Sequence, residues 1–217
     1  MEDFENSKFT DSSQLPESLP MFPLPNVVLF PNMLLPLYIF EPRYKKMIHD
    51  CLRGNRLLGI ILLRKDWEKE EGDPTPYEVG GMGQIIKSTK LPNGNMNILV
   101  RGVSKIRILE YLEADEPYRV ARIEGIRDRF EPSEDLTNLT QQLVKMFKQV
   151  ISFRYKQADR ILSSLDLLVD PQDIAYFVVS ILALDVHEKQ ILLETFSGEE
   201  QIRKLIRFLM RDLAIWN

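Results

Sequence analysis

The stretch that decides the fold of this chain is LPMFPLPNVVLFPNMLLPLYIFEPRY, residues 19–44, which is dense in both prolines and large apolar side chains. Proline has no backbone N–H to donate to a β-ladder, so it is confined to edge strands, strand starts and bulges. The stretch therefore predicts edge strands and exposed turns, and apolar side chains on such edges are candidates for a binding patch. They can equally form the core of a β-rich region, because an edge strand also buries one face.

Within this stretch, we expect the loop at residues 30–34 to be the exposed part. Pro31 prevents regular ladder pairing, Asn32 tolerates the left-handed geometry of a turn, and Met33 is a soft side chain that can fit varied partners. The candidate polypeptide-binding residues are Phe30, Pro31, Met33 and Leu34.

Proline and glycine divide the rest of the chain. Of 13 prolines, 12 precede residue 133, and of 10 glycines, nine do. Both residues are costly inside helices, so the first part should be rich in strands and turns and the second part helical. An Asn93-Gly94 pair predicts a hairpin. The expected strands are residues 27–30, 34–40, 59–63, 83–86, 96–100, 106–109 and 118–126.

Helices are indicated by apolar residues at helical spacing. One short helix interrupts the first part, with Pro42 near its start and Gly54 after its end. After residue 133 the pattern predicts four or five helices. Asp170 precedes Pro171 as an N-cap, and residues 197–200 form a capping box for the last helix. Each helix has one apolar face only, so the helices should pack as a bundle.

These patterns predict an α+β chain in three parts. Residues 1–18 are acidic and polar without periodicity, which predicts a disordered tail. Residues 19–132 should form the β-rich subdomain with its one short helix, and residues 133–217 the helical bundle.

Charge and cysteine content narrow the class of protein. The net charge is −4, and residues 1–132 and 133–217 each carry −2, so neither half has the basic surface that nucleic acids and anionic membranes attract. The single cysteine, Cys51, cannot form an internal disulfide, which fits a reducing compartment. With no signal-peptide pattern and no apolar run near 20 residues, we expect a cytoplasmic location.

The sequence offers little for catalysis. No glycine is followed by lysine, which excludes the phosphate-binding GxxxxGK[ST] loop. His187-Glu188 opens like the zinc motif HExxH, but Ile191 stands where the second histidine is needed. With two histidines and one cysteine, we expect no metal site, no cofactor and no enzymatic activity.

Four segments together resemble the N-terminal domain of Lon proteases: residues 19–44, VGGMGQI at 79–85, ILVRGVSKIRI at 98–108 and DIAYFVVSILALDVHEKQILLE at 173–194. The resemblance implies a β-rich pseudo-barrel similar to PUA domains, followed by a helical bundle. It also implies that Glu41-Pro42-Arg43-Tyr44 is a turn that defines the fold, with Glu41 and Arg43 as hydrogen-bonding anchors rather than catalysts.

The function implied by this resemblance is non-catalytic recognition of unfolded or degron-bearing polypeptides, as an adaptor or sensor. The expected partners are unfolded or extended polypeptides. A full-length Lon protease or a second copy of this chain is a further expected partner, and we expect no binding to nucleic acid or membrane. Two alternatives stay open. One is a nucleic-acid-binding PUA-like module, which a steep salt dependence of binding would favour. The other is a small-molecule pocket at the junction of the two subdomains.

Overall fold

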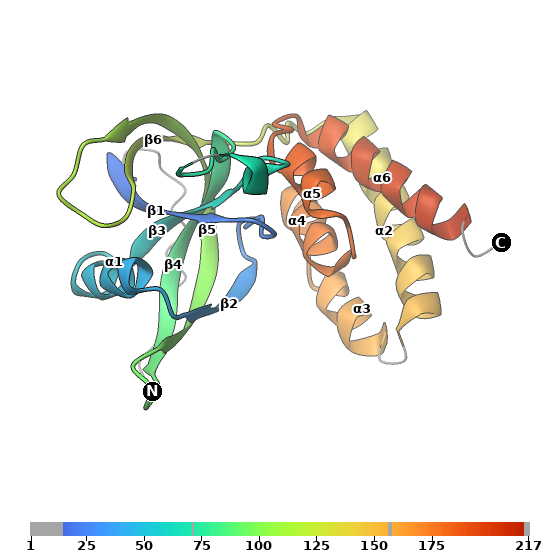
Figure 1. Cartoon of the computed structure of the whole chain (residues 1–217). Helices are drawn as coiled ribbons and strands as arrows, with labels where there is room; N and C mark the ends of the chain where they lie inside the picture. The colour runs from blue at the N-terminus through green and yellow to red at the C-terminus, as the bar shows by residue number, and fades with distance from the viewer. Residues whose placement is uncertain (1–14, 71, 156–157, 215–217) are drawn as a thin grey trace. The chain divides into compact units, whose positions relative to one another are not determined.

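A computed structural model describes residues 15–70, 72–155 and 158–214. It divides into two compact units, one ending at Ile126 and one beginning at Arg127. Of the tail predicted at residues 1–18, residues 1–14 lie outside the described residues, and strand β1 begins at Ser18. The class is α+β, as predicted, with a mixed sheet in unit 1 and helices in unit 2 (Figure 1).

Unit 1 is a six-stranded sheet that closes nearly into a ring. The strand order is β2-β5-β4-β3-β1-β6, and a further β5–β6 pairing joins the ends of the five-stranded part. Strand β1 runs parallel to β3, and all other pairings are antiparallel. Among the described residues, strand β2 pairs only with β5 and so has one free edge. The strands are β1 Ser18–Leu24, β2 Leu34–Ile39, β3 Leu57–Leu62, β4 Val79–Lys90, β5 Met96–Leu112 and β6 Val120–Ile126.

The helix α1, Pro42–Arg53, lies where the apolar spacing predicted it, with proline at its start and Gly54 as its C-cap. Its inner residues Tyr44, Met47, Ile48 and Cys51 join strand residues in one buried apolar cluster. A second buried cluster contains residues of β1, β3, β4, β5 and β6. The two clusters explain why β3 is buried along its whole length, since alternate side chains enter different clusters.

Residues 27–30 are not a strand, so this part of the prediction is wrong. The segment crosses over β4 and β5 with its backbone against their glycines, and a Cβ added at Gly102 would collide with the carbonyl oxygen of Phe30. Two backbone hydrogen bonds hold the following turn, from Asn32 N–H to Gly102 at 2.9 Å and from Gly102 N–H to Met33 at 2.8 Å. Asn32 has a φ of 64°, the left-handed geometry expected of it.

Strands β4 and β5 are much longer than the predicted ranges, whereas β2 and β6 are slightly shorter. The segments predicted at 96–100 and 106–109 belong to one strand, β5, and the segment at 83–86 is part of β4. Strand β1 lies in the stretch for which edge strands were predicted, but it was given no range of its own among the expected strands. The hairpin between β4 and β5 is confirmed, with Gly94 at a φ of 77° and its N–H bonded to the Leu91 carbonyl. A short 3₁₀ turn, η2 at Trp67–Lys69, lies between β3 and β4.

Unit 2 is helical, as predicted. Its helices are α2 Glu134–Arg154, α3 Ala158–Asp166, α4 Pro171–Ile181, α5 Val186–Leu193 and α6 Gly198–Ala214. Asp170 caps α4 by accepting a hydrogen bond from Gln172 N–H at 2.7 Å. At α6, Ser197 Oγ accepts from Glu200 N–H at 3.4 Å. The capping box with both reciprocal bonds is at α5, between Asp185 and Glu188, which the sequence analysis did not identify.

Within unit 2, the segment that precedes α2 is held by specific contacts. The Asp128 carboxylate accepts hydrogen bonds from Tyr176 at 2.8 Å and Gln201 at 3.1 Å. Arg129 N–H donates to the Phe196 carbonyl at 2.8 Å, and the Arg129 carbonyl accepts from Gly198 N–H at 2.9 Å.

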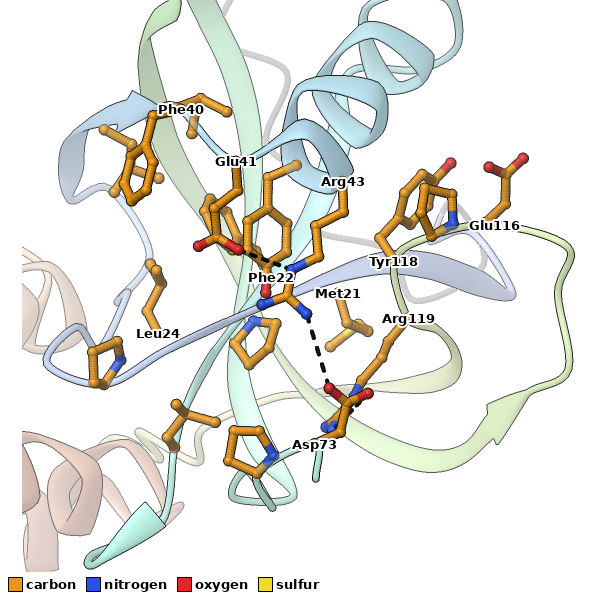
Figure 2. A pocket seen from close by; sticks show the side chains of 18 of the residues that line it. Met21, Phe22, Leu24, Phe40, Glu41, Arg43, Asp73, Glu116, Tyr118 and Arg119 are labelled. Atoms are coloured by element: carbon orange, nitrogen blue, oxygen red, sulfur yellow. Dashed lines mark hydrogen bonds and ion pairs between the residues drawn. The ribbon is translucent and has the colours of Figure 1, made fainter. Parts of the chain in front are cut away.

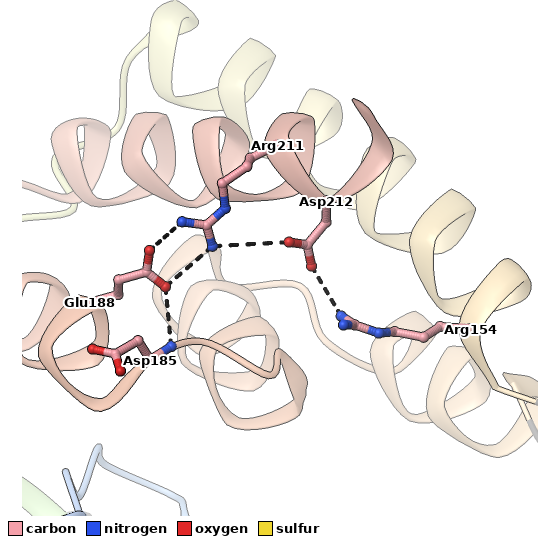
Figure 3. A network of polar contacts seen from close by, with 5 residues as sticks. All are labelled: Arg154, Asp185, Glu188, Arg211 and Asp212. Carbon is pink, nitrogen blue, oxygen red and sulfur yellow. Dashed lines mark hydrogen bonds and ion pairs between the residues drawn. The ribbon is translucent and has the colours of Figure 1, made fainter. Parts of the chain in front are cut away.

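An ion-pair network connects three helices of unit 2 (Figure 3). Arg211 of α6 donates two hydrogen bonds to Glu188 of α5, one of them 3.2 Å long. Arg211 also lies 4.0 Å from the carboxylate of Asp212. Asp212 in turn pairs with Arg154 of α2 at 3.0 Å. The hydrogen bonds from Arg211 lower the pKa of the Glu188 carboxyl below its ordinary value.

Candidate functional site

The candidate site is a cleft of about 790 Å³ in unit 1. Its walls come from five segments that are distant in sequence: β1, the end of β2, the first turn of α1, the chain around η2 and the β5–β6 connection. Closing the sheet into a ring brings β1 and the β5–β6 connection together, and α1 then covers one side.

The floor of the cleft is apolar. Phe22 of β1 and Tyr44 of α1 lie with ring centroids 4.3 Å apart, and both are buried. Leu24 and Leu37 are half-buried and pack against the same cluster. The Tyr44 hydroxyl is uncharged at neutral pH, and burial raises its pKa further above the usual value. Such a surface is suited to apolar side chains of a ligand.

Aromatic side chains extend this floor outward along β2. Tyr38 and Phe40 line the cleft and are 50% and 58% exposed, with ring centroids 6.1 Å apart. The Tyr38 hydroxyl accepts a hydrogen bond from the Asn95 amide, which fixes the ring. Leu34 points outward from the same strand and is 53% exposed. Because β2 has a free edge, this apolar row lies beside unpaired backbone.

The other end of the cleft is charged (Figure 2). Arg43 donates from Nε to the Glu41 carboxylate at 2.9 Å. Arg43 and Arg119 both approach the Asp73 carboxylate, at 3.8 Å and 3.5 Å respectively. The guanidinium of Arg119 also lies 5.4 Å from the centre of the Tyr111 ring.

A further polar group closes the cleft beside α1. Lys46 contacts both Asp50 and Glu116, and the Tyr118 hydroxyl donates to Asp50 at 2.9 Å. The hydrogen bond from Lys46 is the main reason that the pKa of the Asp50 carboxyl is lowered. These contacts connect α1 to the β5–β6 connection and fix that wall of the cleft.

The loop predicted to bind polypeptide is only partly exposed. Phe30 is fully buried, so its expected exposure is wrong: its backbone is held against β5, and its ring belongs to the interior. Pro31 and Met33 are half-buried, and Leu34 is exposed. The binding role of this loop stays a prediction, with Leu34 its most accessible member.

Glu41 and Arg43 are bonded to one another, and their side chains are 38% and 45% exposed. Their role as anchors of the fold stays a prediction, but both line the cleft. The analysis of the sequence did not identify Arg119, Asp73 or Tyr38 as site residues. Only the folded chain brings them together, and no local motif marks them. Among the described residues, no group of three or more His, Cys, Asp or Glu side chains could hold a metal ion.

Comparison with known proteins identifies the family. Residues 18–211 match the ATP-dependent protease La (LON) substrate-binding domain. The chain therefore belongs to the family of Lon substrate-binding domains.

Curated relatives and solved structures agree with this assignment. The chain is 30% identical over 214 residues to the Lon protease of Dictyoglomus thermophilum, covering 97% of this chain and 26% of that protein. It is 29% identical over 199 residues to the Lon protease of Azospirillum brasilense, covering 90% and 24%. The chain thus spans about a quarter of the length of the curated relatives it matches.

The fold matches solved domains of the same family. The N-terminal domain of a Mycobacterium avium complex Lon protease superposes with a TM-score of 0.74 at 19% identity, covering 89% of this chain and 98% of that one. A Lon N-terminal domain protein from Xanthomonas campestris gives a TM-score of 0.65 at 20% identity, with 88% and 97% covered. No helix in the described ranges is long and apolar enough to cross a membrane.

Proposed function

We propose that this chain is a non-catalytic polypeptide-binding module and that the cleft of unit 1 takes extended, apolar segments of its clients. The observation that carries the proposal is the apolar floor of the cleft at Phe22 and Tyr44. The half-exposed aromatic rings of Tyr38 and Phe40 line the same cleft and extend this apolar surface. Large exposed apolar side chains gathered at one cleft are characteristic of interaction sites.

The free edge of β2 supports an extended rather than a helical client. An extended chain can add to an open sheet edge through backbone hydrogen bonds while its alternate side chains enter neighbouring pockets. Strand β2 presents Leu34 and Tyr38 on its exposed face, with Phe40 next along the chain. Pro36 lacks an N–H, which shortens the run of donors and favours weak, reversible pairing over permanent association.

The charges of the cleft disfavour a nucleic acid as its occupant. Its lining includes four carboxylates, Glu41, Asp73, Glu113 and Glu116, and two guanidiniums, Arg43 and Arg119. A phosphate backbone is bound by an excess of positive charge. A polypeptide segment with apolar side chains has an uncharged backbone, so the carboxylates of the cleft do not repel it.

The test uses a permanently unfolded, fluorescently labelled polypeptide, reduced and carboxymethylated α-lactalbumin, titrated with the full chain. The double substitution Tyr38→Ser and Phe40→Ser should weaken binding by about 10-fold or more, because burying an aromatic side chain is favourable by roughly 1.5–3 kcal/mol. The melting temperature should fall by no more than about 2–3 °C, since both side chains are half-exposed.

The matched control is Leu109→Ser on β5, because Leu109 is 54% exposed but does not line the cleft. It should leave binding unchanged. Equal loss of binding in the control and in the double variant would mean that exposed apolar area in general, and not this cleft, binds the client. Unchanged binding in both would refute the proposed site.

A further inference from the structure

Two arginines at the charged end of the cleft share one carboxylate. Arg43 comes from the first turn of α1, and Arg119 comes from the connection just before β6. Their terminal nitrogens lie 3.8 Å and 3.5 Å from different oxygens of Asp73 (Figure 2). The two guanidiniums therefore flank a single position at which a carboxylate lies.

Neither arginine depends on Asp73 for its place. The bond from Arg43 Nε to Glu41 orients the guanidinium and leaves the terminal nitrogens toward Asp73. Arg119 is 24% exposed and has its guanidinium over the Tyr111 ring. The two cations would stay near these positions if Asp73 were replaced by another carboxylate.

Asp73 itself is weakly held. Both contacts are longer than the roughly 2.7–2.9 Å of a charge-assisted hydrogen bond, and the Asp73 side chain is 69% exposed. Ion pairs of this kind contribute little to stability. A ligand carboxylate that makes short bonds to both guanidiniums can therefore replace it at small cost.

The surroundings favour an anion at this point despite the acidic lining. Glu41 is already bonded to Arg43, and Glu116 contacts Lys46. The N-cap residue of α1, Glu41, makes no side-chain cap hydrogen bond, so the positive end of the helix dipole is not capped by a side chain there. The apolar floor begins beside the pair, at Phe22 and Tyr44, and Arg43 lies 4.7 Å from the Tyr44 ring centre.

We propose that Arg43 and Arg119 bind the α-carboxylate at the C-terminus of a client polypeptide, whose last apolar side chains occupy the floor of the cleft. Asp73 occupies the same position in the free protein and competes with the client. This proposal rests on the proposed function. It adds that the cleft recognises the C-terminal end of the client chain rather than an internal segment.

The test compares three short labelled peptides by fluorescence anisotropy with the full chain. The first ends in apolar residues with a free carboxylate, the second is its C-terminal amide, and the third is an amide with an internal aspartate near its end. The free acid should bind about 10-fold more tightly than either amide, as expected for hydrogen bonds between charged groups.

Three variants assign the preference to residues. Arg119→Gln should abolish the difference between acid and amide. Asp73→Asn should increase it by strengthening acid binding only, because the competing carboxylate is gone. The control is Glu124→Gln on β6, an exposed position that does not line the cleft. It also removes one negative charge from unit 1, so the difference should stay as in the unaltered chain.

The outcomes are separable from those of the proposed function. If acid and amide bind the Asp73→Asn variant equally, the C-terminal preference is refuted, although binding of both peptides would still support the cleft as a polypeptide site. If the internal-aspartate amide binds as tightly as the free acid, the arginines read side-chain carboxylates and recognition of the chain end is overturned. If none of the three peptides binds, both proposals are refuted.

Discussion

At the scale of single residues, Cys51 illustrates how burial controls chemistry. It lies on the inner face of α1, 4% exposed, and its thiol donates to the Leu57 carbonyl at 3.4 Å. Burial raises the pKa of the Cys51 thiol to about 12, with the nearby Asp50 carboxylate adding to the effect. The reactive thiolate is therefore almost absent at neutral pH.

We expect the native protein to react with a thiol reagent such as DTNB at pH 8 far more slowly than the unfolded protein. In denaturant the thiol regains a pKa near its ordinary value of roughly 8.5, so labelling should be complete within minutes. Absorbance at the thionitrobenzoate band gives both rates. Fast labelling of native protein would contradict the buried position of Cys51.

Gly102 is a second residue whose identity follows from one contact. Gly102→Ala places a methyl group against the Phe30 carbonyl, which is backbone and cannot move without shifting the whole crossing segment. We expect a loss of about 2–4 kcal/mol in the free energy of unfolding, measured by urea denaturation.

The control for this substitution is Gly54→Ala. Its Cβ would lie 3.6 Å from the nearest atom, the Asp50 carbonyl oxygen, and the φ of Gly54, −99°, is outside the left-handed region. The expected change is below about 1 kcal/mol in either direction. Similar losses in both variants would indicate that the tight approach at Gly102 is not the cause.

At the scale of elements, the ion-pair network of unit 2 links α5 to α6. Because Arg211 lowers the pKa of Glu188 in the folded state, the pair contributes stability above the unfolded pKa of roughly 4.3, and that contribution is lost as the pH falls through the folded pKa. Arg211 is half-exposed, so solvent reduces its contribution.

Arg211→Gln should therefore lower the free energy of unfolding by less than about 1 kcal/mol at pH 7, and the difference from the unaltered chain should shrink toward zero near pH 3. Urea denaturation at a series of pH values measures it. Arg207→Gln, at an exposed position of the same helix, is the control and should show no such pH dependence. A difference that grows as the pH falls would contradict the assignment.

The elements also show what sequence patterns can and cannot predict. The helices were located well because apolar spacing and caps such as Asp170 are local signals. Residues 27–30 were misread as a strand because their β-like composition reflects burial against β4 and β5. The contact between Phe30 and Gly102 joins residues that are 72 apart in the chain. The prolines of the first stretch, Pro20 and Pro23 among them, predicted edge strands, whereas the ladder places β1 between β3 and β6.

The site was less predictable than the fold. The sequence pointed to the apolar stretch and to Arg43, but Arg119 and Asp73 meet it only through the closure of the sheet and the chain around η2. Phe30 was chosen because it lies in the stretch rich in proline and apolar residues. Its burial follows from the close approach of its backbone to Gly102, which the local sequence does not indicate.

At the scale of the whole molecule, the chain consists of two units with separate interiors, and its family is defined over residues 18–211. The candidate site lies wholly within unit 1, in residues that precede Arg127.

The near-closed ring of unit 1 has a thermodynamic consequence for binding. Strand β5 pairs with β2, β4 and β6, so no strand beside the cleft can slide in register without breaking a ladder elsewhere. The receptor therefore loses little conformational entropy when a client binds, and nearly all of that loss falls on the client. Clients that are already extended, for instance through prolines beside their apolar residues, lose least and should be held longest.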